Sequence, residues 1–290
     1  MYATAKRLIE ECEKNKKTIG QIVLEGEMEK FGKTREEIRN GLFEMLDTME
    51  ESSKNTLDGP ADSGLGIITG FAHKMNEYSK GNTLTGSRIT KAMALSFSTF
   101  ETNAAMGKIV ASPTAGSSGI LPAALMIAKE ELGANRETLL EGMLTAVGIG
   151  QMIGMHATFA GAEGGCQAEC GSAAAMAAGA LISIMGGSPK KILEGASIAL
   201  VNVLGLVCDP IGGFVEYPCT FRNASGVINA MISADLAMAG TYSVIPFDEV
   251  CIAMGEVGHA MNENLRETGT GGLAATKTGI QIREEFFKEN

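Results

Sequence analysis

The chain has 290 residues, a formal net charge of −10 from 34 acidic and 24 basic side chains, and 45% hydrophobic residues. This hydrophobic content allows a sizeable core, and the acidic balance argues against nucleic-acid binding, which requires a basic face. The apolar runs are shorter than the ~20 residues of a membrane span, and the charged N-terminus contains no signal-peptide core. We therefore expect a cytoplasmic protein that handles small molecules and binds no membrane.

The first 60 residues are rich in charged side chains and predict two or three amphipathic helices. One helix is expected to begin at Thr34, where Glu37 completes the spacing of a capping box. Residues 50–64 contain many turn-forming side chains and indicate a boundary. We therefore predict an N-terminal helical segment at residues 1–60 that packs on a larger domain at residues 61–290.

Beyond this boundary, helical patterns alternate with glycine-containing loops. Helices are expected at residues 67–80, 89–107, 120–132, 136–156, 167–185, 188–204, 221–238 and 247–264. Strand patterns are scarce, and residues 108–112 and 213–217 are the short candidates. The sequence therefore predicts a mainly α fold, a compact multi-helix domain with Gly-rich functional loops and few or no strands.

The segment ASPTAGSSGILPAAL, residues 111–125, leads from a loop into an apolar helix with Pro122 in its first turn. Free backbone N–H groups and the helix dipole make such a helix start suitable for an anion, and Ser117 and Ser118 add hydroxyl donors. The loop lacks the lysine of a nucleotide-binding loop, so a carboxylate is the more suitable ligand. A purely structural helix start remains the alternative.

Four of the six cysteines lie in two further glycine-rich segments. GAEGGCQAECGSAAAMAAG contains Cys166 at a loop-to-helix junction, where a thiol ionises readily, and Cys170 one turn later. CDPIGGFVEYPCTFRNASG places Cys208 and Cys219 at the two ends of a rigid loop. Such clustering in a reducing compartment indicates metal binding or catalysis rather than disulfide formation.

The spacing of these cysteines bears on the kind of metal. Zinc sites usually contain close Cys-x-x-Cys pairs, which this sequence lacks, whereas the ligands of an iron–sulfur cluster vary widely in spacing. Cys12 and Cys251 lie on apolar stripes and are expected to be small buried hydrophobes. His156 precedes Cys166 by ten residues and could approach the site, although a histidine at a helix end often bonds to the backbone.

The segments SPTAGSSGILPA, GAEGGCQAECGSA, GLVCDPIGGFVEYPCTFRNA and NLRETGTGGLA together resemble the α subunit of iron–sulfur-dependent L-serine dehydratases. They occur in the family's order and cover most of residues 100–275. The resemblance implies a lyase of serine catabolism and gluconeogenesis that converts L-serine to pyruvate and ammonia without pyridoxal phosphate. It also implies that residues 61–290 form the catalytic domain, that Cys166, Cys208 and Cys219 hold a 4Fe–4S cluster, and that Cys170 is a packed neighbour.

The resemblance further implies how the site is divided. The open iron of the cluster would act as a Lewis acid on the serine hydroxyl. Substrate contacts are expected from Thr114, Ser117, Ser118, Gly119, Arg222 and Asn223. The histidine-bearing β segment of single-chain relatives is missing from this sequence, so we expect a heterodimer whose β subunit provides the general base, with His156 as the weaker catalytic candidate.

Two alternatives remain open at this point. A related class of lyases eliminates sulfide from L-cysteine, and the sequence does not distinguish that substrate from L-serine. A non-enzymatic redox sensor would carry a recognition module such as a basic helix, and this acidic chain has no obvious one. The fourth cluster ligand in the resting state and the oligomeric stoichiometry are likewise not determined by these residues.

Overall fold

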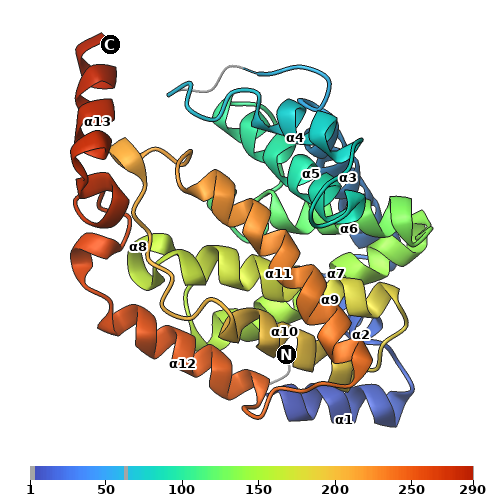
Figure 1. The fold of residues 1–290 in the computed structure, drawn as a ribbon. Helices are drawn as coiled ribbons and strands as arrows, with labels where there is room; N and C mark the ends of the chain where they lie inside the picture. The colour runs from blue at the N-terminus through green and yellow to red at the C-terminus, as the bar shows by residue number, and fades with distance from the viewer. Residues whose placement is uncertain (1–3, 62–64, 290) are drawn as a thin grey trace.

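The computed structural model of the protein describes residues 4–61 and 65–289, which contain thirteen α-helices and no β-strands (Figure 1). The predicted mainly α fold is confirmed. The two strand predictions were wrong, because residues 108–112 form a loop, and residues 213–217 consist of the last residue of a short 3-10 turn and the loop after it. A β-strand needs a neighbouring strand to satisfy its backbone hydrogen bonds, and neither segment has one. Within the described residues, the only isolated bridge joins Cys208 to Arg266.

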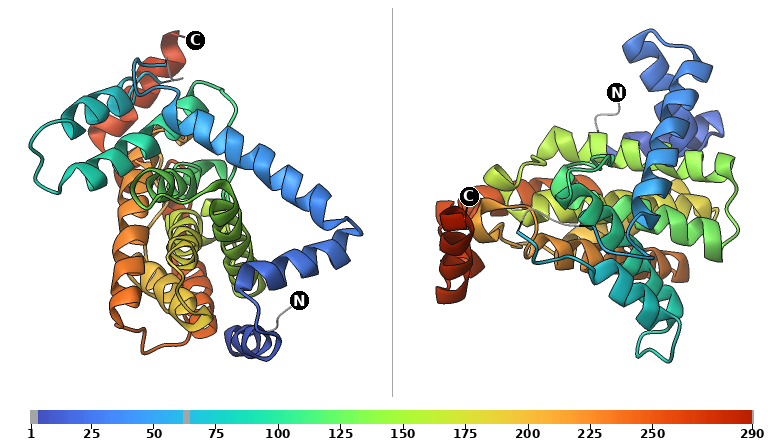
Figure 2. Two further views of the ribbon diagram at one scale, coloured as in Figure 1. Left: turned by 90° about the vertical axis from the view of Figure 1, so that its right-hand side faces the viewer. Right: turned by 90° about the horizontal axis from the view of Figure 1, so that it is seen from above.

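Three helices form the N-terminal part: α1 (Ala5–Asn15), α2 (Ile19–Phe31) and α3 (Arg35–Lys54). The predicted capping box is present, since Thr34 N donates to Glu37 Oε2 at 2.8 Å and Glu37 N donates to Thr34 Oγ1 at 3.2 Å. These helices lie along one side of the molecule (Figure 2), and their buried side chains belong to the same hydrophobic cluster as the rest of the core. The division at residue 60 stays a prediction, and residues 62–64 of the predicted boundary lie outside the described part.

The remaining helices are α4 (Phe71–Ser79), α5 (Ser87–Ala104), α6 (Ile120–Glu131), α7 (Arg136–His156), α8 (Gly161–Gly164), α9 (Ser172–Ile184), α10 (Pro189–Val201), α11 (Cys219–Ala239), α12 (Phe247–Ala260) and α13 (Lys277–Glu289). Each of the eight helices predicted beyond the boundary overlaps one of them. Helix α7 is long and apolar enough to cross a membrane, but 67% of its apolar window is buried inside the protein, as in a core helix.

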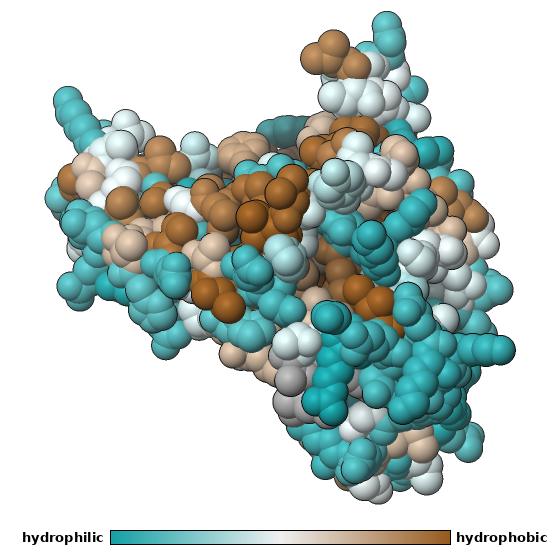
Figure 3. All heavy atoms as spheres, turned by 90° about the horizontal axis from the view of Figure 1, so that it is seen from below, coloured by the Kyte–Doolittle hydropathy of each residue, from teal (hydrophilic) through white to brown (hydrophobic). Residues whose placement is uncertain are grey.

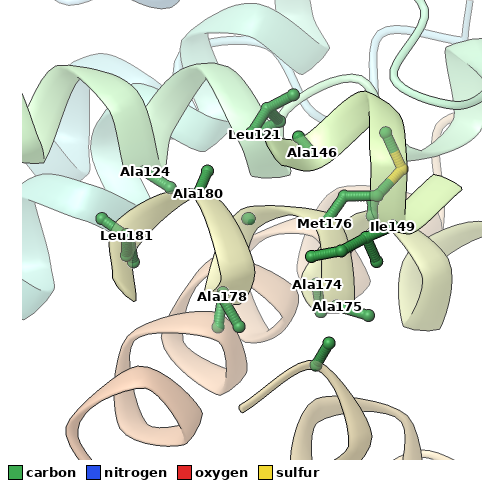
Figure 4. Packing of buried hydrophobic residues seen from close by; sticks show 14 of the residues in the cluster. Leu121, Ala124, Ala146, Ile149, Ala174, Ala175, Met176, Ala178, Ala180 and Leu181 are labelled. Carbon is green, nitrogen blue, oxygen red and sulfur yellow. The ribbon is translucent and has the colours of Figure 1, made fainter. Parts of the chain in front are cut away.

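Helix α9 lies at the centre and packs against α6, α7, α10 and α11 (Figure 1). All its residues from Ser172 to Ile182 are buried, because a helix that is hydrophobic on every side must be enclosed. Figure 4 shows how its alanines allow neighbouring side chains such as Ile149 to approach closely. At Gly179 the approach is closest, since a Cβ there would lie 1.9 Å from Ile149 Cδ1.

The segment that precedes α9 is held by α12. A Cβ on Gly258 of α12 would lie 2.8 Å from the Cα of Gly164 in α8, so the two backbones touch. The fully buried Gln167 side chain strengthens this contact, because its Nε2 donates to Met254 O at 3.0 Å and its Oε1 accepts from Gly205 N at 2.9 Å. The position of the α8–α9 junction is therefore fixed by α12 and by the loop that follows α10.

This contact generates a prediction about stability. Gly258→Ala should lower the free energy of unfolding by about 1–3 kcal/mol, because the added methyl group must separate two touching backbones. Gly41→Ala on α3 is the matched control, since a Cβ there meets nothing within 4 Å and the change should be neutral or stabilise the helix by up to ~1 kcal/mol. Urea denaturation followed by circular dichroism measures both. Equal stability of the two variants would contradict the backbone contact.

Candidate active site

Cys166 directly precedes a π-helical turn, η2 (Gln167–Gly171), between α8 and α9, and Cys170 lies within it. Single π turns often occur at functional sites because they reorient side chains inside a helix. Here the thiols of Cys166 and Cys170 lie 3.4 Å apart, and both side chains are buried. Cys170 therefore contacts Cys166 directly, and its role as a packed neighbour of the cluster ligands stays a prediction.

Cys208 is held by a distant part of the chain. Its N–H donates to Leu265 O at 2.8 Å and its carbonyl accepts from Glu267 N at 2.7 Å, so the NLRETGTGGLA segment lies alongside it. Cys219 is the first residue of α11 and is also buried. Both thiols are near enough to Cys166 to be affected by its charge. The structure thus brings together the three predicted cluster ligands from three separate segments.

The environment of these thiols differs from one to the next. A hydrogen bond from Cys170 lowers the pKa of Cys166, and the nearby Arg222 guanidinium adds to the effect against the opposing influence of burial. Burial raises the pKa values of Cys208 and Cys219, and the negative charge of Cys166 raises them further. Buried thiols of this kind become thiolates when a metal centre compensates the cost of the buried charge.

Arg222 is fixed beside the thiols by an acidic partner. Its Nη2 donates to Asp209 Oδ1 at 2.5 Å, and Asp209 Oδ2 in turn accepts from Leu273 N at 2.7 Å. The other terminal nitrogen, Nη1, is buried and has no hydrogen-bond partner within residues 4–61 and 65–289. The guanidinium also acts on the Cys166 thiol beside it, and because a buried donor without a partner is costly, an Nη1 N–H group can serve a ligand as well.

Glu169 is a site residue that the sequence analysis did not single out. Its carboxylate is 8% exposed; Oε1 accepts from Thr114 Oγ1 at 2.7 Å, and Oε2 lies 4.0 Å from Cys208 Sγ. Burial raises the pKa of this carboxyl group. A Cβ on Gly161 would lie 2.8 Å from Glu169 Oε2 and 3.0 Å from Cys208 Sγ, so these groups pack so closely around the backbone that only a glycine fits there. The signal in the sequence was a lone acidic residue between Cys166 and Cys170.

The predicted carboxylate loop lies against the same region. Asn223 joins it to α11, because Nδ2 donates to Gly116 O at 2.7 Å and to Cys219 O at 2.9 Å, while Oδ1 accepts from Gly119 N at 2.9 Å. Ser117 and Ser118 are fully buried and bond within the loop, Ser118 Oγ to the carbonyl of residue 115 at 2.8 Å. Their predicted contact with substrate, like that of Gly119, therefore stays a prediction.

The three histidines face other groups, and the buried Nε2 of His156 has no hydrogen-bond partner among the described residues. His156 Nε2 lies 3.8 Å from Asp248 Oδ1, and the Asp248 carboxylate accepts the backbone N–H of Ala5 at 2.9 Å. The Nδ1 atoms of His73 and His259 each lie 2.9 Å from a backbone carbonyl oxygen. In the described residues no histidine makes a hydrogen bond to the cysteine region, and the catalytic role of His156 stays a prediction.

The arrangement of these side chains can be compared with the ligand geometry of a single metal ion and of an iron–sulfur cluster. Among the described residues, no three His, Cys, Asp or Glu side chains are close enough to share one metal ion. A 4Fe–4S cluster makes a different demand, because each thiolate binds a separate iron and the sulfur atoms lie further apart. Three buried thiols from separate segments fit that demand, and the Arg222 guanidinium beside Cys166 favours the thiolate form that a cluster requires.

The fold and the site define an all-helical protein with a buried cysteine-rich centre. Residues 14–274 match the sequence model of the family described as serine dehydratase alpha chain. The chain is 56% identical to the L-serine dehydratase alpha chain of Peptoniphilus asaccharolyticus, over 100% of this chain and 99% of the relative. It is 44% identical to the probable L-serine dehydratase alpha chain of Bacillus subtilis, over 99% and 96%. The protein belongs to the serine dehydratase alpha-chain family.

A longer relative differs in extent. The L-serine dehydratase of Streptomyces coelicolor is 35% identical over 94% of this chain, but the match covers 60% of that relative. The remaining 40% of that relative lies outside the region matched by this chain.

The Asn223 bonds predict a large effect of a small change. Asn223→Ala should lower the free energy of unfolding by about 2–5 kcal/mol, because it leaves buried backbone groups of the loop and of α11 without partners. Ser225→Ala, at an exposed position on the same helix, should change it by less than about 0.5 kcal/mol. Thermal and chemical denaturation give both values. An unchanged free energy of unfolding in the Asn223→Ala variant would show that other contacts hold the loop.

Proposed function

We propose that this chain is the α subunit of an L-serine dehydratase, a lyase that converts L-serine to pyruvate and ammonia. The observation that carries the proposal is the family match over residues 14–274, together with the meeting of Cys166, Cys208 and Cys219 in one buried region. The relatives named above are L-serine dehydratase alpha chains. All six cysteines are free thiols, which fits a reducing cytoplasm.

Cys166, Cys208 and Cys219 would hold a 4Fe–4S cluster, and this cluster would supply a Lewis acid for the β-hydroxyl of serine. Cluster binding requires thiolates, and the lowered pKa of Cys166 favours that form at one ligand position. Cys170 would remain a protonated neighbour, because its hydrogen bond to Cys166, its burial and the charge of Cys166 all raise its pKa. Burial of all four thiols excludes bulk water from the site.

The substrate carboxylate would be bound by Arg222, whose Nη1 has no partner within the described residues. Asp209 fixes the guanidinium, so its free N–H group is oriented before the substrate arrives. Thr114 is partly exposed and donates its hydroxyl proton to Glu169 Oε1, so its part in substrate binding would be to hold the loop against Glu169. Asn223 would act by holding the loop in place, and Ser117, Ser118 and Gly119 by shaping it.

The general base would come from a separate β subunit, because no histidine among the described residues makes a hydrogen bond to the thiol region. The alpha-chain names of the relatives and the extra length of the Streptomyces protein support a second polypeptide. The surface offers places for it. An open apolar groove between α5 and α11 is lined by Met93, Phe97, Phe221 and Ile228, and further hydrophobic patches are visible in Figure 3.

The cluster proposal can be tested by cysteine substitution. Protein purified without air should contain about four irons per chain, and Cys166→Ser, Cys208→Ser or Cys219→Ser should each remove the cluster. Cys12→Ser is the control, because that thiol is buried among the N-terminal helices and burial raises its pKa to about 11. Iron analysis and the visible absorption of the cluster are the measurements. Stoichiometric zinc in place of iron would refute the assignment.

The division of labour can be tested with the two subunits. The isolated chain should hold its cluster and dehydrate L-serine negligibly, and addition of the β subunit should restore turnover, because the base must reach the α-proton. His156→Ala should keep most of the activity of the complex, since its imidazole faces Asp248. Pyruvate formation from L-serine and from L-cysteine is measured in parallel. Full turnover by the isolated chain would make His156 the leading base, and a preference for L-cysteine would change the substrate.

A further inference from the structure

Glu267 lies in the NLRETGTGGLA segment, which runs alongside Cys208. Its backbone adopts the left-handed conformation at φ 62°, which is uncommon for a residue with a side chain. Its N–H donates to Cys208 O at 2.7 Å, and the neighbouring Arg266 forms the bridge to Cys208. Glu267 is thus held beside a proposed cluster ligand by backbone bonds, and its side chain is free to serve another purpose.

The Glu267 carboxylate points into the site. A Cβ on Gly161 would lie 3.2 Å from Glu267 Oε2, 3.0 Å from Cys208 Sγ and 2.8 Å from Glu169 Oε2, so all three groups lie close together around this glycine. The carboxylate of Glu267 makes no hydrogen bond or ion pair within residues 4–61 and 65–289, and the residue is half-buried. Glu169, in contrast, is nearly inaccessible and already accepts a hydrogen bond from Thr114. Glu267 is therefore the reachable anion at this centre.

L-Serine carries two charges, a carboxylate and an α-ammonium group, and the proposed function assigns a partner only to the carboxylate. An ammonium group that enters a buried site needs an anion and hydrogen-bond acceptors to offset its lost hydration. We propose that Glu267 binds the α-ammonium group of the substrate and selects amino acids over hydroxy acids of the same shape. This inference rests on the proposed function, because it deepens the substrate recognition of that same site.

The test uses the αβ complex with its cofactor. Glu267→Gln keeps the size of the side chain and removes its charge, so the KM for L-serine should rise about tenfold or more, with a smaller change in kcat. The inhibition constant of 3-hydroxypropanoate should not change, because this analogue has the carboxylate and the hydroxyl group but no ammonium group. Glu263→Gln, an exposed carboxylate four residues earlier, is the matched control and should leave both values unchanged.

A second variant guards against misfolding. Glu267→Asn suits the left-handed backbone and shortens the side chain, so it should fold and show the same selective loss. An unchanged KM for L-serine in both variants would overturn the inference. Equal weakening of L-serine and 3-hydroxypropanoate would also overturn it, since Glu267 would then shape the site without binding the ammonium group. Absence of serine turnover in the unmodified complex would instead refute the proposed function itself.

Discussion

The small size of the side chains on α9 is the constraint from which the rest of the architecture follows. Because Ala and Gly occupy its buried faces, α7, α10 and α11 can all approach one helix that has no solvent-facing side over Ser172–Ile182. Close-packed helices leave little freedom to slide, since cores have the density of organic crystals. The N-terminal end of α9 therefore presents its π turn, and with it Cys166 and Cys170, at a defined place in the molecule.

Around that turn, buried polar groups are joined in a chain of contacts. Asp209 connects Arg222 at the start of α11 to the backbone of Leu273, and Glu169 connects Thr114 to the neighbourhood of Cys208. Each buried charge or dipole thus fixes two segments of the sequence that are far apart. Such groups stabilise little by themselves, but leaving any of them without its partner is expensive. The network accordingly favours one arrangement of the site over others.

The fold could be predicted from the sequence where local signals agreed. Helix α7 has the predicted bounds because apolar periodicity and its Asn135 cap coincide. Helix α13 was not predicted, and it makes its contacts with short turns near the site. The meeting of the cysteines, which have no shared local pattern, was implied by family resemblance alone. Glu169 and Glu267 were missed because their importance depends on contacts across many residues of sequence, visible only in three dimensions.

The bond pair between Cys208 and residues 265 and 267 has a consequence for biosynthesis. The ribosome synthesises Cys166, Cys208 and Cys219 before it makes residues 265 and 267, which align Cys208. During translation the nascent chain therefore carries thiols whose final geometry does not yet exist. The bonds that align Cys208 form only after residues 265 and 267 have been made, so the buried thiol region reaches its final geometry late in translation.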